Sequence, residues 1–344
     1  MDCVNYLKKY QEIPYNIFKN ALENNRFFHA YLLSGPTGTP IFEIAKFLSK
    51  CLLNNKHELK EEDNIISKTV ENRTYPDLII IDTKKEQVKI DDIRRIEDKF
   101  SQTSINQLGI KIYIINLIEN LRPNEANALL KFLEEPLDNT YAILTTENEY
   151  SILPTILSRT EIVRFSSVNK NDLIDECIKL GVNKKDAEIL TFFQNDASMI
   201  KEEIENEDYL EVKKYVENFI NLLPNKDKLR FFVLNEINPN LKTKIQIRLF
   251  IDLLIIYLKE ANKMKLKENI IIGESKDKLN VIISNVNSID DAILKLMNYR
   301  YELSYNLNSQ LLFLNLIESI FGALYGYRIL FKLIIYWIWK KLLF

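Results

Sequence analysis

Residues 124–160, NEANALLKFLEEPLDNTYAILTTENEYSILPTILSRT, decide the expected fold of this chain. Their first part carries apolar side chains at positions i, i+3, i+4 and i+7, namely Ala126, Leu129, Leu130 and Leu133. This spacing places the side chains on one face of an α-helix. The first part of the stretch is therefore predicted to be a short amphipathic helix.

Proline residues bound this helix. Pro123 suits its first turn, where a missing backbone N–H costs little, and Glu125 lies near the positive end of the helix dipole. Pro136 ends the helix, because proline disfavours α-helical backbone in the residue before it. Residues 141–146 then form an apolar run typical of a buried strand, and residues 158–160 close a short helical stretch. Patterning alone favours a helix–strand–helix unit of an α/β domain.

Five apolar runs in the N-terminal half are predicted strands, and helices alternate with them. The runs are residues 31–34, 78–82, 111–115, 141–146 and 161–165. Strands that alternate with helices form a mainly parallel sheet covered on both faces. The expected fold class is an α/β domain with a mainly parallel five-stranded sheet and flanking helices, followed by a small helical region and an all-α C-terminal region.

Changes in this pattern predict the domain boundaries. The strand signals lie within residues 1–167, and residues 168–206 carry three short helical segments without convincing strands. Long apolar helix faces fill residues 207–320, and they suit either a core or contacts with other subunits. The tail, residues 321–344, is apolar and aromatic, but charges interrupt it. Its uncharged runs are too short for a membrane-spanning helix, which needs about 20 residues.

The composition is that of an ordinary folded protein. The 344 residues carry a net charge of −2, so no overall basic field indicates nucleic-acid binding. Cys3, Cys51 and Cys177 are far apart in the sequence and suggest neither a disulfide framework nor a zinc cluster. The N-terminus has no apolar segment of the secretory kind, so a cytoplasmic location is expected.

The runs NALLKFLEEP, ILTT and LPTILSRT, in this order and spacing, resemble the clamp-loader branch of the AAA+ ATPases. HAYLLSGP, at residues 29–36, resembles the entry to the phosphate loop of the bacterial subunits of this branch. The resemblance covers residues 1–205 by motif and the remainder by helical character. It implies a P-loop-like AAA+ domain over 1–167, a three-helix lid over 168–206 and a helical collar domain over 207–320.

The phosphate loop has lost the residues that its chemistry requires. A working loop reads GxxxxGK[ST], and Gly35 and Gly38 belong to its retained first half. Pro40, Ile41 and Phe42 take the places of the second glycine, the lysine and the hydroxyl residue. Proline removes a backbone N–H, isoleucine offers no cation to the phosphates, and phenylalanine cannot ligate Mg²⁺. We therefore expect the scaffold of a nucleotide site without the residues that bind phosphate and Mg²⁺.

The positions for metal and base are also changed. The resemblance implies that an active member ends its third strand with Asp-Glu, and Asn116 and Leu117 stand there in this chain. Leucine cannot act as a base at any pKa. Thr145 and Thr146 fall at the sensor position of the family and are interpreted as vestigial or structural. The sensor arginine of the lid would fall near Ile200, so that nucleotide contact is lost as well.

No cofactor and no metal are expected. Relatives often carry a zinc-binding cysteine cluster between the positions of Cys51 and Pro76. This chain offers only Cys51 and His57 there, which are too few for a tetrahedral zinc site. His29 has neither an acid nor a nucleophile placed beside it and is interpreted as structural.

Arg159, by contrast, keeps its family context. In relatives the corresponding triplet is Ser-Arg-Cys, and its arginine reaches into the ATP site of the neighbouring subunit. Here the triplet is Ser158, Arg159 and Thr160. The resemblance implies that Arg159 is an arginine finger acting in trans, with Ser158 as part of the supporting motif. The alternative is a solvated surface charge.

The implied function is that of a non-catalytic subunit, a stator, of the clamp loader of bacterial DNA polymerase III. Its partners would be ATPase subunits of the gamma/tau type and the delta subunit, in a hetero-oligomeric ring. Through this ring it would act on the sliding clamp and primed DNA during replication, with no membrane partner. Two alternatives remain open: an active ATPase motor subunit, and a membrane-associated adaptor that uses the tail.

Overall fold

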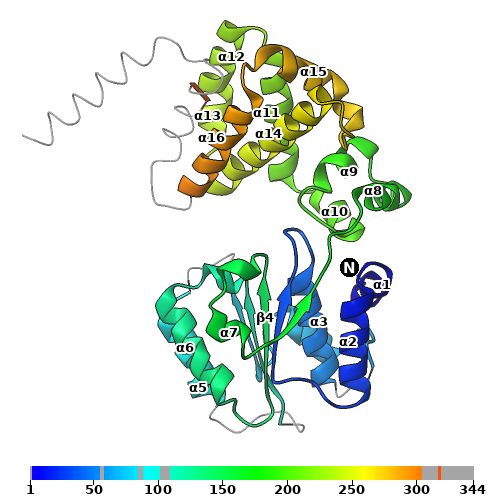
Figure 1. Ribbon diagram of the computed structural model, residues 1–344, viewed down its shortest axis with the longest axis vertical. Helices are drawn as coiled ribbons and strands as arrows, with labels where there is room; N and C mark the ends of the chain where they lie inside the picture. The colour runs from blue at the N-terminus through cyan, green and yellow to red at the C-terminus, as the bar shows by residue number, and fades with distance from the viewer. Residues whose placement is uncertain (1, 55–57, 84–87, 101–108, 304–316, 319–344) are drawn as a thin grey trace, which may run out of the picture. The chain divides into compact units, whose positions relative to one another are not determined.

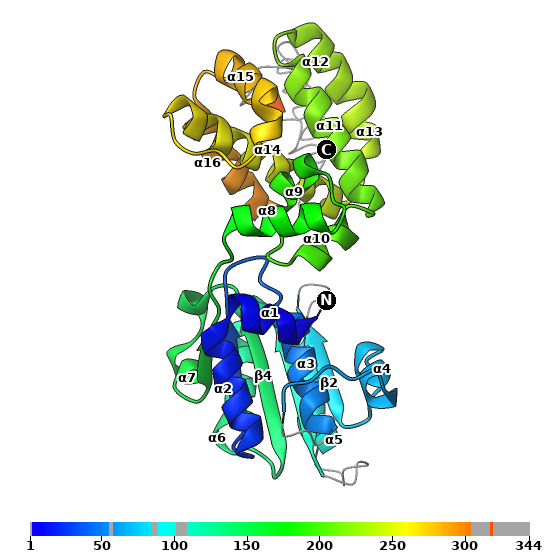
Figure 2. The same ribbon diagram turned by 90° about the vertical axis from the view of Figure 1, so that its right-hand side faces the viewer.

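The computed structural model describes residues 2–54, 58–83, 88–100, 109–303 and 317–318. The chain divides into two compact units, which Figures 1 and 2 show in two views. The first unit is Met1–Asn169 with Phe193–Asp196, and the second is Lys170–Phe192 with the chain from Ala197 onward. The expected tail, 321–344, lies outside the described residues, as do residues 304–316 and 319–320 of the expected collar.

The first unit is built on a five-stranded sheet in the order β2-β3-β4-β1-β5, with every pair of neighbours parallel. The strands are β1 Ala30–Ser34, β2 Leu78–Asp82, β3 Lys111–Asn116, β4 Thr140–Thr146 and β5 Glu161–Arg164. The central strands are apolar and buried on both faces, as expected of a parallel sheet with helices on each side. These strands confirm the predicted α/β class, with ends within one residue of the predicted runs.

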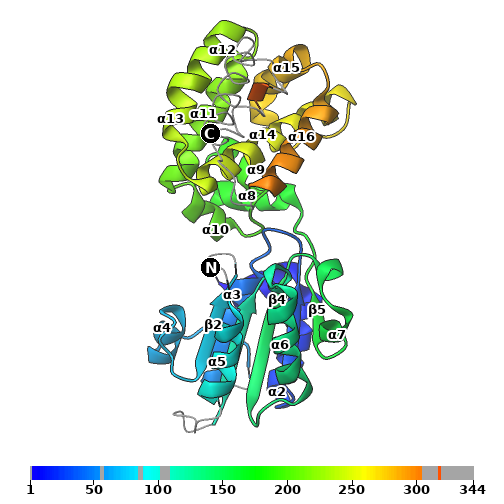
Figure 3. The ribbon, with the colours of Figure 1, turned by 90° about the vertical axis from the view of Figure 1, so that its left-hand side faces the viewer.

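Helices α5 to α7 cover one face of the sheet (Figures 1 and 3). They are α5 Ile90–Phe100, α6 Pro123–Glu134 and α7 Pro154–Leu157, with the short 3₁₀ turns η1 Ile118–Asn120 and η2 Glu149–Ser151 between them. The predicted apolar face of α6 is buried at Leu129 and Leu133, which belong to the same core cluster as Leu32 and Leu144 of the strands. The predicted amphipathic helix therefore positions the segment that leads to Arg159.

Four helices lie on the other side of the sheet (Figure 2). They are α1 Cys3–Tyr10, α2 Glu12–Glu23, α3 Ile41–Leu53 and α4 Ile65–Glu71. Helix α3 follows the degenerate phosphate loop and buries an apolar face that includes Ile44, Ala45 and Leu48. The scaffold around the loop is thus fixed by apolar packing.

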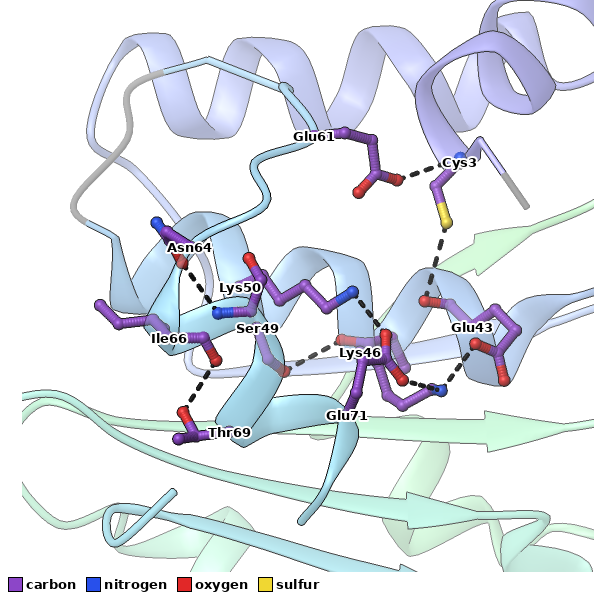
Figure 4. A network of polar contacts seen from close by, with 12 residues as sticks. Cys3, Glu43, Lys46, Ser49, Lys50, Glu61, Asn64, Ile66, Thr69 and Glu71 are labelled. Carbon is purple, nitrogen blue, oxygen red and sulfur yellow. Dashed lines mark hydrogen bonds and ion pairs between the residues drawn. The ribbon is translucent and has the colours of Figure 1, made fainter. Parts of the chain in front are cut away.

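Ion pairs tie α4 to α3, as Figure 4 shows. The Lys46 Nζ lies 2.6 Å from Glu43 and 2.8 Å from Glu71, and the Lys50 Nζ lies 2.5 Å from Glu71. Burial alone would raise the pKa of Glu71, but hydrogen bonds from Lys46 and Lys50 outweigh it and lower that pKa. Of this charge cluster, Glu71 lies in the stretch where relatives were expected to carry zinc. Among the described residues, no group of three or more His, Cys, Asp or Glu side chains is placed to hold a metal ion.

The second unit is helical throughout its described part. Its elements are α8 Lys170–Lys179, α9 Lys184–Leu190, α10 Ala197–Glu203, α11 Glu207–Leu222, α12 Lys226–Phe232, the π-helical turn η3 Val233–Ile237, α13 Asn238–Asn240, α14 Lys244–Lys265, η4 Gly273–Ser275, α15 Lys276–Asn285 and α16 Ile289–Glu302. Helix α14 begins with a capping box between Thr243 and Gln246 and packs against α11, α15 and α16. None of the described helices is long and apolar enough to pass through a bilayer.

Helices α8–α10, the expected lid, belong to the same compact unit as the expected collar helices. Asp186 of α9 accepts a 2.7 Å hydrogen bond from the Tyr209 hydroxyl of α11 and forms an ion pair with Lys213 of α11. Lys185 of α9 pairs with Glu217 of α11 over 2.8 Å. The first boundary, near residue 168, falls close to the division between the units, whereas no division falls at 206–207. A lid and a collar that fold separately stay a prediction for limited proteolysis.

Candidate functional site

The degenerate phosphate loop, residues 35–40, connects β1 to α3 at the carboxyl edge of the sheet. Two backbone donors at the end of the loop are engaged locally: the Thr39 N–H donates to the Pro36 carbonyl over 3.0 Å, and the Ile41 N–H donates to the Thr39 carbonyl over 2.8 Å. Pro36 and Pro40 have no N–H to offer. Donors that could cradle a phosphate are therefore absent or already used at these positions.

The next two side chains make apolar and aromatic contacts. Ile41, at the lysine position, is only 2% exposed and lies in the core of the unit. The ring of Phe42, at the hydroxyl position, lies 5.5 Å from the Lys46 Nζ and 5.9 Å from the Arg73 guanidinium carbon. Neither side chain can hold Mg²⁺ or a phosphate oxygen, and both instead stabilise the beginning of α3 by packing and cation–π contact.

A distant segment of the chain, Phe193–Asp196, lies against the loop and belongs to the same compact unit. The Asn195 N–H donates to the Gly38 carbonyl over 2.9 Å, and its Nδ2 donates to the Thr37 carbonyl over 3.3 Å. The Gly38 backbone has a φ of +88°, and a Cβ added there would stand 2.4 Å from the Phe193 carbonyl oxygen. The space beside Gly38 is thus filled by the chain itself.

The former metal and base positions form a closed hydrogen-bond network. Asn116 donates to Asp82 over 2.8 Å and accepts from the Thr145 hydroxyl over 2.7 Å. The same Thr145 oxygen accepts from the Leu117 N–H over 2.9 Å, and Asp82 forms a 3.2 Å ion pair with Arg73. Asp82, Asn116 and Thr145 are all buried, so these contacts satisfy groups that would be costly to leave unpaired. The carboxylate and amide here bind protein groups.

Leu117 adopts left-handed backbone geometry, with a φ of 55°. Such geometry is unusual for a non-glycine residue and must be held by its surroundings. Hydrogen bonds supply that support: Thr145 accepts from the Leu117 N–H, and the Thr83 hydroxyl donates to the Leu117 carbonyl over 2.9 Å. Thr145 therefore helps to hold the backbone of Leu117 in this geometry.

Arg159 lies at the opposite edge of the sheet. It follows α7 and precedes β5, whose first residue, Glu161, is paired with Tyr31 near the start of β1. The phosphate loop follows the other end of β1, after Ser34. Five residues of strand span roughly 16 Å, which an arginine side chain cannot bridge. Arg159 therefore cannot serve the loop of its own chain.

Among the described residues, three groups of the same chain contact the Arg159 guanidinium. Its Nη2 lies 2.8 Å from Oε1 of Glu134, the last residue of α6. Its Nη1 donates to the Thr155 carbonyl over 2.8 Å and to the Ser158 hydroxyl over 3.2 Å. These contacts hold the guanidinium, while the Arg159 side chain remains 33% exposed and open to an incoming group.

A surface pocket of about 530 Å³ adjoins Arg159. It is lined by Phe28, His29, Leu133, Glu134, Ser158, Arg159, Thr160 and Glu161. The buried Nε2 atom of His29 has no hydrogen-bond partner among the described residues. No described acid or nucleophile contacts this nitrogen, and His29 enters no catalytic constellation here.

The structure gathers the predicted residues into two places. The carboxyl edge of the sheet holds Gly35, Gly38, Pro40, Ile41, Phe42, Asn116 and Leu117, and the amino edge holds Ser158 and Arg159. Ile200 of α10 is fully buried and offers no cation. Sequence reasoning missed Asn195, Asp82 and Glu134. Their contacts join residues far apart in the chain, and no motif signals them.

The strand order, the loop before α3 and the arginine beyond the far edge are the arrangement that the resemblance to AAA+ proteins predicts for a degenerate nucleotide site. A family model described as DNA polymerase III, delta subunit, matches residues 10–169. The chain is 27% identical over 314 residues to the DNA polymerase III subunit delta' of Bacillus subtilis, covering 88% of this chain and 94% of the relative. The chain is thus similar to a delta-prime subunit over nearly its whole length, and this similarity confirms the resemblance to clamp-loader proteins.

Two further matches have either lower coverage or lower identity. The DNA polymerase III subunit tau of Bacillus subtilis is 33% identical over 175 residues, covering 49% of this chain and 30% of the relative. A Thermotoga maritima structure titled as a DNA polymerase III, gamma subunit-related protein aligns with a TM-score of 0.49 at 19% identity. That alignment covers 89% of this chain and 98% of the other.

Proposed function

We propose that this chain is a non-catalytic, delta-prime-type subunit of a DNA polymerase III clamp loader. It would act as a stator that helps load the sliding clamp onto primed DNA during replication. Similarity to a delta-prime subunit over nearly the whole of both chains supports this assignment. The alternative of an ATPase motor needs a lysine and a hydroxyl at positions 41 and 42, which hold Ile41 and Phe42.

One observation carries the proposal for the site. Arg159 keeps an ordered, partly exposed guanidinium at the amino edge of the sheet, while the loop at the carboxyl edge has lost its chemistry. A guanidinium is always charged and presents a planar fork of donors, which suits charge that develops on a γ-phosphate. Such an arginine needs no ATP site of its own, only that of a neighbouring subunit.

The test is a reconstituted loader in which this chain carries Arg159→Ala. An arginine finger is worth about 10³- to 10⁵-fold in other phosphoryl-transfer systems. An assembly with several ATP sites loses only the turnover of the site that faces Arg159, so a partial loss of ATPase stimulated by clamp and DNA is expected. Arg159→Lys should rescue little, because a point charge does not reproduce the fork.

Arg164→Ala is a matched control for this test. Arg164 ends β5, the strand that follows Arg159, is 65% exposed in its side chain and pairs with Glu149 over 2.6 Å. Its loss should leave the stimulated ATPase unchanged. Unchanged ATPase and clamp loading with Arg159→Ala, in a complex of normal composition, would show that Arg159 is only structural.

The proposed partners are ATPase subunits of the gamma/tau type and a delta subunit, in a hetero-oligomeric ring in the cytoplasm. The chain would reach the sliding clamp and primed DNA through this ring. Affinity capture of the full chain, followed by identification of bound proteins, should recover these subunits in fixed proportion. Recovery of the chain alone, from cells in which the loader is intact, would contradict the assignment.

A further inference from the structure

We propose that Glu134 is a positioning residue for Arg159, whose guanidinium it holds ready for a neighbouring ATP site. This inference rests on the proposed role of Arg159 in trans. The two residues come from different elements, since Glu134 ends α6 and Arg159 follows α7. Their 2.8 Å ion pair joins the predicted LEEP and SRT runs in space.

The contacts of the Arg159 guanidinium are of two kinds: one with the backbone of α7, which is fixed, and one with a side chain, which can be exchanged. The Thr155 carbonyl belongs to the backbone of α7 and receives Nη1 over 2.8 Å, together with the Ser158 hydroxyl at 3.2 Å. The Glu134 carboxylate receives Nη2 and is itself half exposed. An incoming phosphate oxygen can therefore replace or share the Glu134 contact while the Thr155 contact stays.

Packing alone does not fully confine the Arg159 side chain, because a third of it is exposed. A long side chain loses rotamer freedom when it is ordered, and that loss opposes a productive orientation at the moment of reaction. An ion pair made before the neighbour arrives orders the side chain in advance. A carboxylate is suited to this purpose, because it offers the guanidinium fork oxygen acceptors much as a phosphate does.

The surroundings leave room for the exchange. Glu134, Ser158 and Arg159 line the same pocket of about 530 Å³. Glu135, the next residue, is exposed and makes no contact with Arg159 among the described residues. The two neighbouring carboxylates thus differ in their contact with the guanidinium, and Glu135 supplies a control of equal charge.

The experiment measures the ATPase stimulated by clamp and DNA in a reconstituted loader, with this chain as Glu134→Ala, Glu134→Gln or Glu135→Ala. Exposed ion pairs contribute little, so Glu134→Ala should lower the stimulated rate about two- to fivefold. Glu134→Gln keeps an oxygen acceptor and should retain more of the rate than Glu134→Ala. Glu135→Ala should match the unchanged chain. Thermal unfolding of each variant shows whether the fold is retained.

A double variant separates positioning from a general structural effect. If Glu134 acts only through Arg159, Glu134→Ala should have no further effect when Arg159→Ala is already present. An equal loss in that background, or a higher rate with Glu134→Ala alone, would overturn the inference. If Arg159→Ala lowers the stimulated ATPase and Glu134→Ala does not, only the positioning role of Glu134 is overturned. No loss with Arg159→Ala, in a complex of normal composition, overturns the proposed function as well.

Discussion

The backbone N–H of Asn195 donates a 2.9 Å hydrogen bond to the carbonyl of Gly38, and this contact closes the degenerate phosphate loop from within the chain. The carbonyl of Phe193 lies so near Gly38 that no side chain fits between them. The loop therefore has two separate features. It lacks the lysine and hydroxyl residues of a working loop, and the chain itself fills the space beside Gly38.

The contact makes Gly38 sensitive to substitution. Gly38→Ala places a Cβ 2.4 Å from the Phe193 oxygen, at a backbone φ of +88°. The φ alone should cost about 1–2 kcal/mol, and the clash with backbone atoms should add about 1–3 kcal/mol. Urea unfolding of the first unit should show the sum as a lower midpoint.

Comparison with Gly181→Ala separates the cost of the clash at Gly38 from the cost of the backbone conformation. Gly181 has a φ of +86°, and an added Cβ there meets nothing within 4 Å. Gly181→Ala should therefore lose only the free energy of placing an alanine at this φ. The loss is measured in the urea unfolding transition of the second unit. Equal losses at Gly38 and Gly181 would show that the segment Phe193–Asp196 yields readily, contrary to a closed loop.

Restoring the motif should not restore nucleotide binding. The variant Pro40→Gly, Ile41→Lys and Phe42→Thr regains the sequence of a working loop. The segment Phe193–Asp196 still occupies the space beside Gly38, so we expect no ATP binding at micromolar concentration by calorimetry, as for the unchanged chain.

The control for this variant is its fold, since Ile41 is a core residue. Circular dichroism should show that the variant is folded, although Ile41→Lys should lower the thermal midpoint because a charge replaces a core side chain. If the change Ile41→Lys unfolds the unit, Pro40→Gly with Phe42→Thr keeps Ile41 in the core and tests the same space. Micromolar binding by either folded variant would mean that the changed residues alone closed the site.

The ion pairs between α3 and α4 should make stability depend on pH. The folded-state pKa of Glu71 is lowered, because hydrogen bonds from Lys46 and Lys50 outweigh its burial. Its contribution is then fully present above roughly pH 4.3 and is lost as the pH falls through the lowered value. Glu71 is 43% exposed, so we expect only about 0.5–1 kcal/mol.

The measurement compares urea unfolding of Glu71→Gln and the unchanged chain at neutral and acidic pH. Their difference should shrink at acidic pH. Asp63→Asn is the control, because Asp63 pairs with Lys68 over 3.2 Å where both side chains are well exposed. It should have little effect at either pH. A difference for Glu71→Gln that grows on acidification would contradict the predicted sign.

Apolar patterning was sufficient to predict the sheet. A buried parallel strand must be apolar on both faces, so runs such as 78–82 and 111–115 stand out from the polar loops. The positions of Pro40, Ile41 and Arg159 followed from motif spacing, because the motif residues are adjacent in the chain. Their family roles remain proposals.

Contacts between distant residues could not be predicted in the same way. Asn195 meets Gly38 only after the chain has passed through β2, β3, β4 and α8–α9, and a single asparagine in a loop has many uses. Glu134 was predicted only as part of a helix end. Its contact with Arg159 depends on how α6 and α7 pack on the sheet, which periodicity does not specify.

The network around Asp82 has a consequence for linkage. A site that binds metal and nucleotide gains stability in proportion to the logarithm of their free concentrations. Here the groups that bind Asp82 are Asn116 and Arg73 of the same chain, so their binding does not depend on the concentration of a free ligand. The contribution of this network to the free energy of unfolding should therefore not change with chelators or with the cellular ratio of ATP to ADP. The stability of ATPases that bind those ligands responds to both.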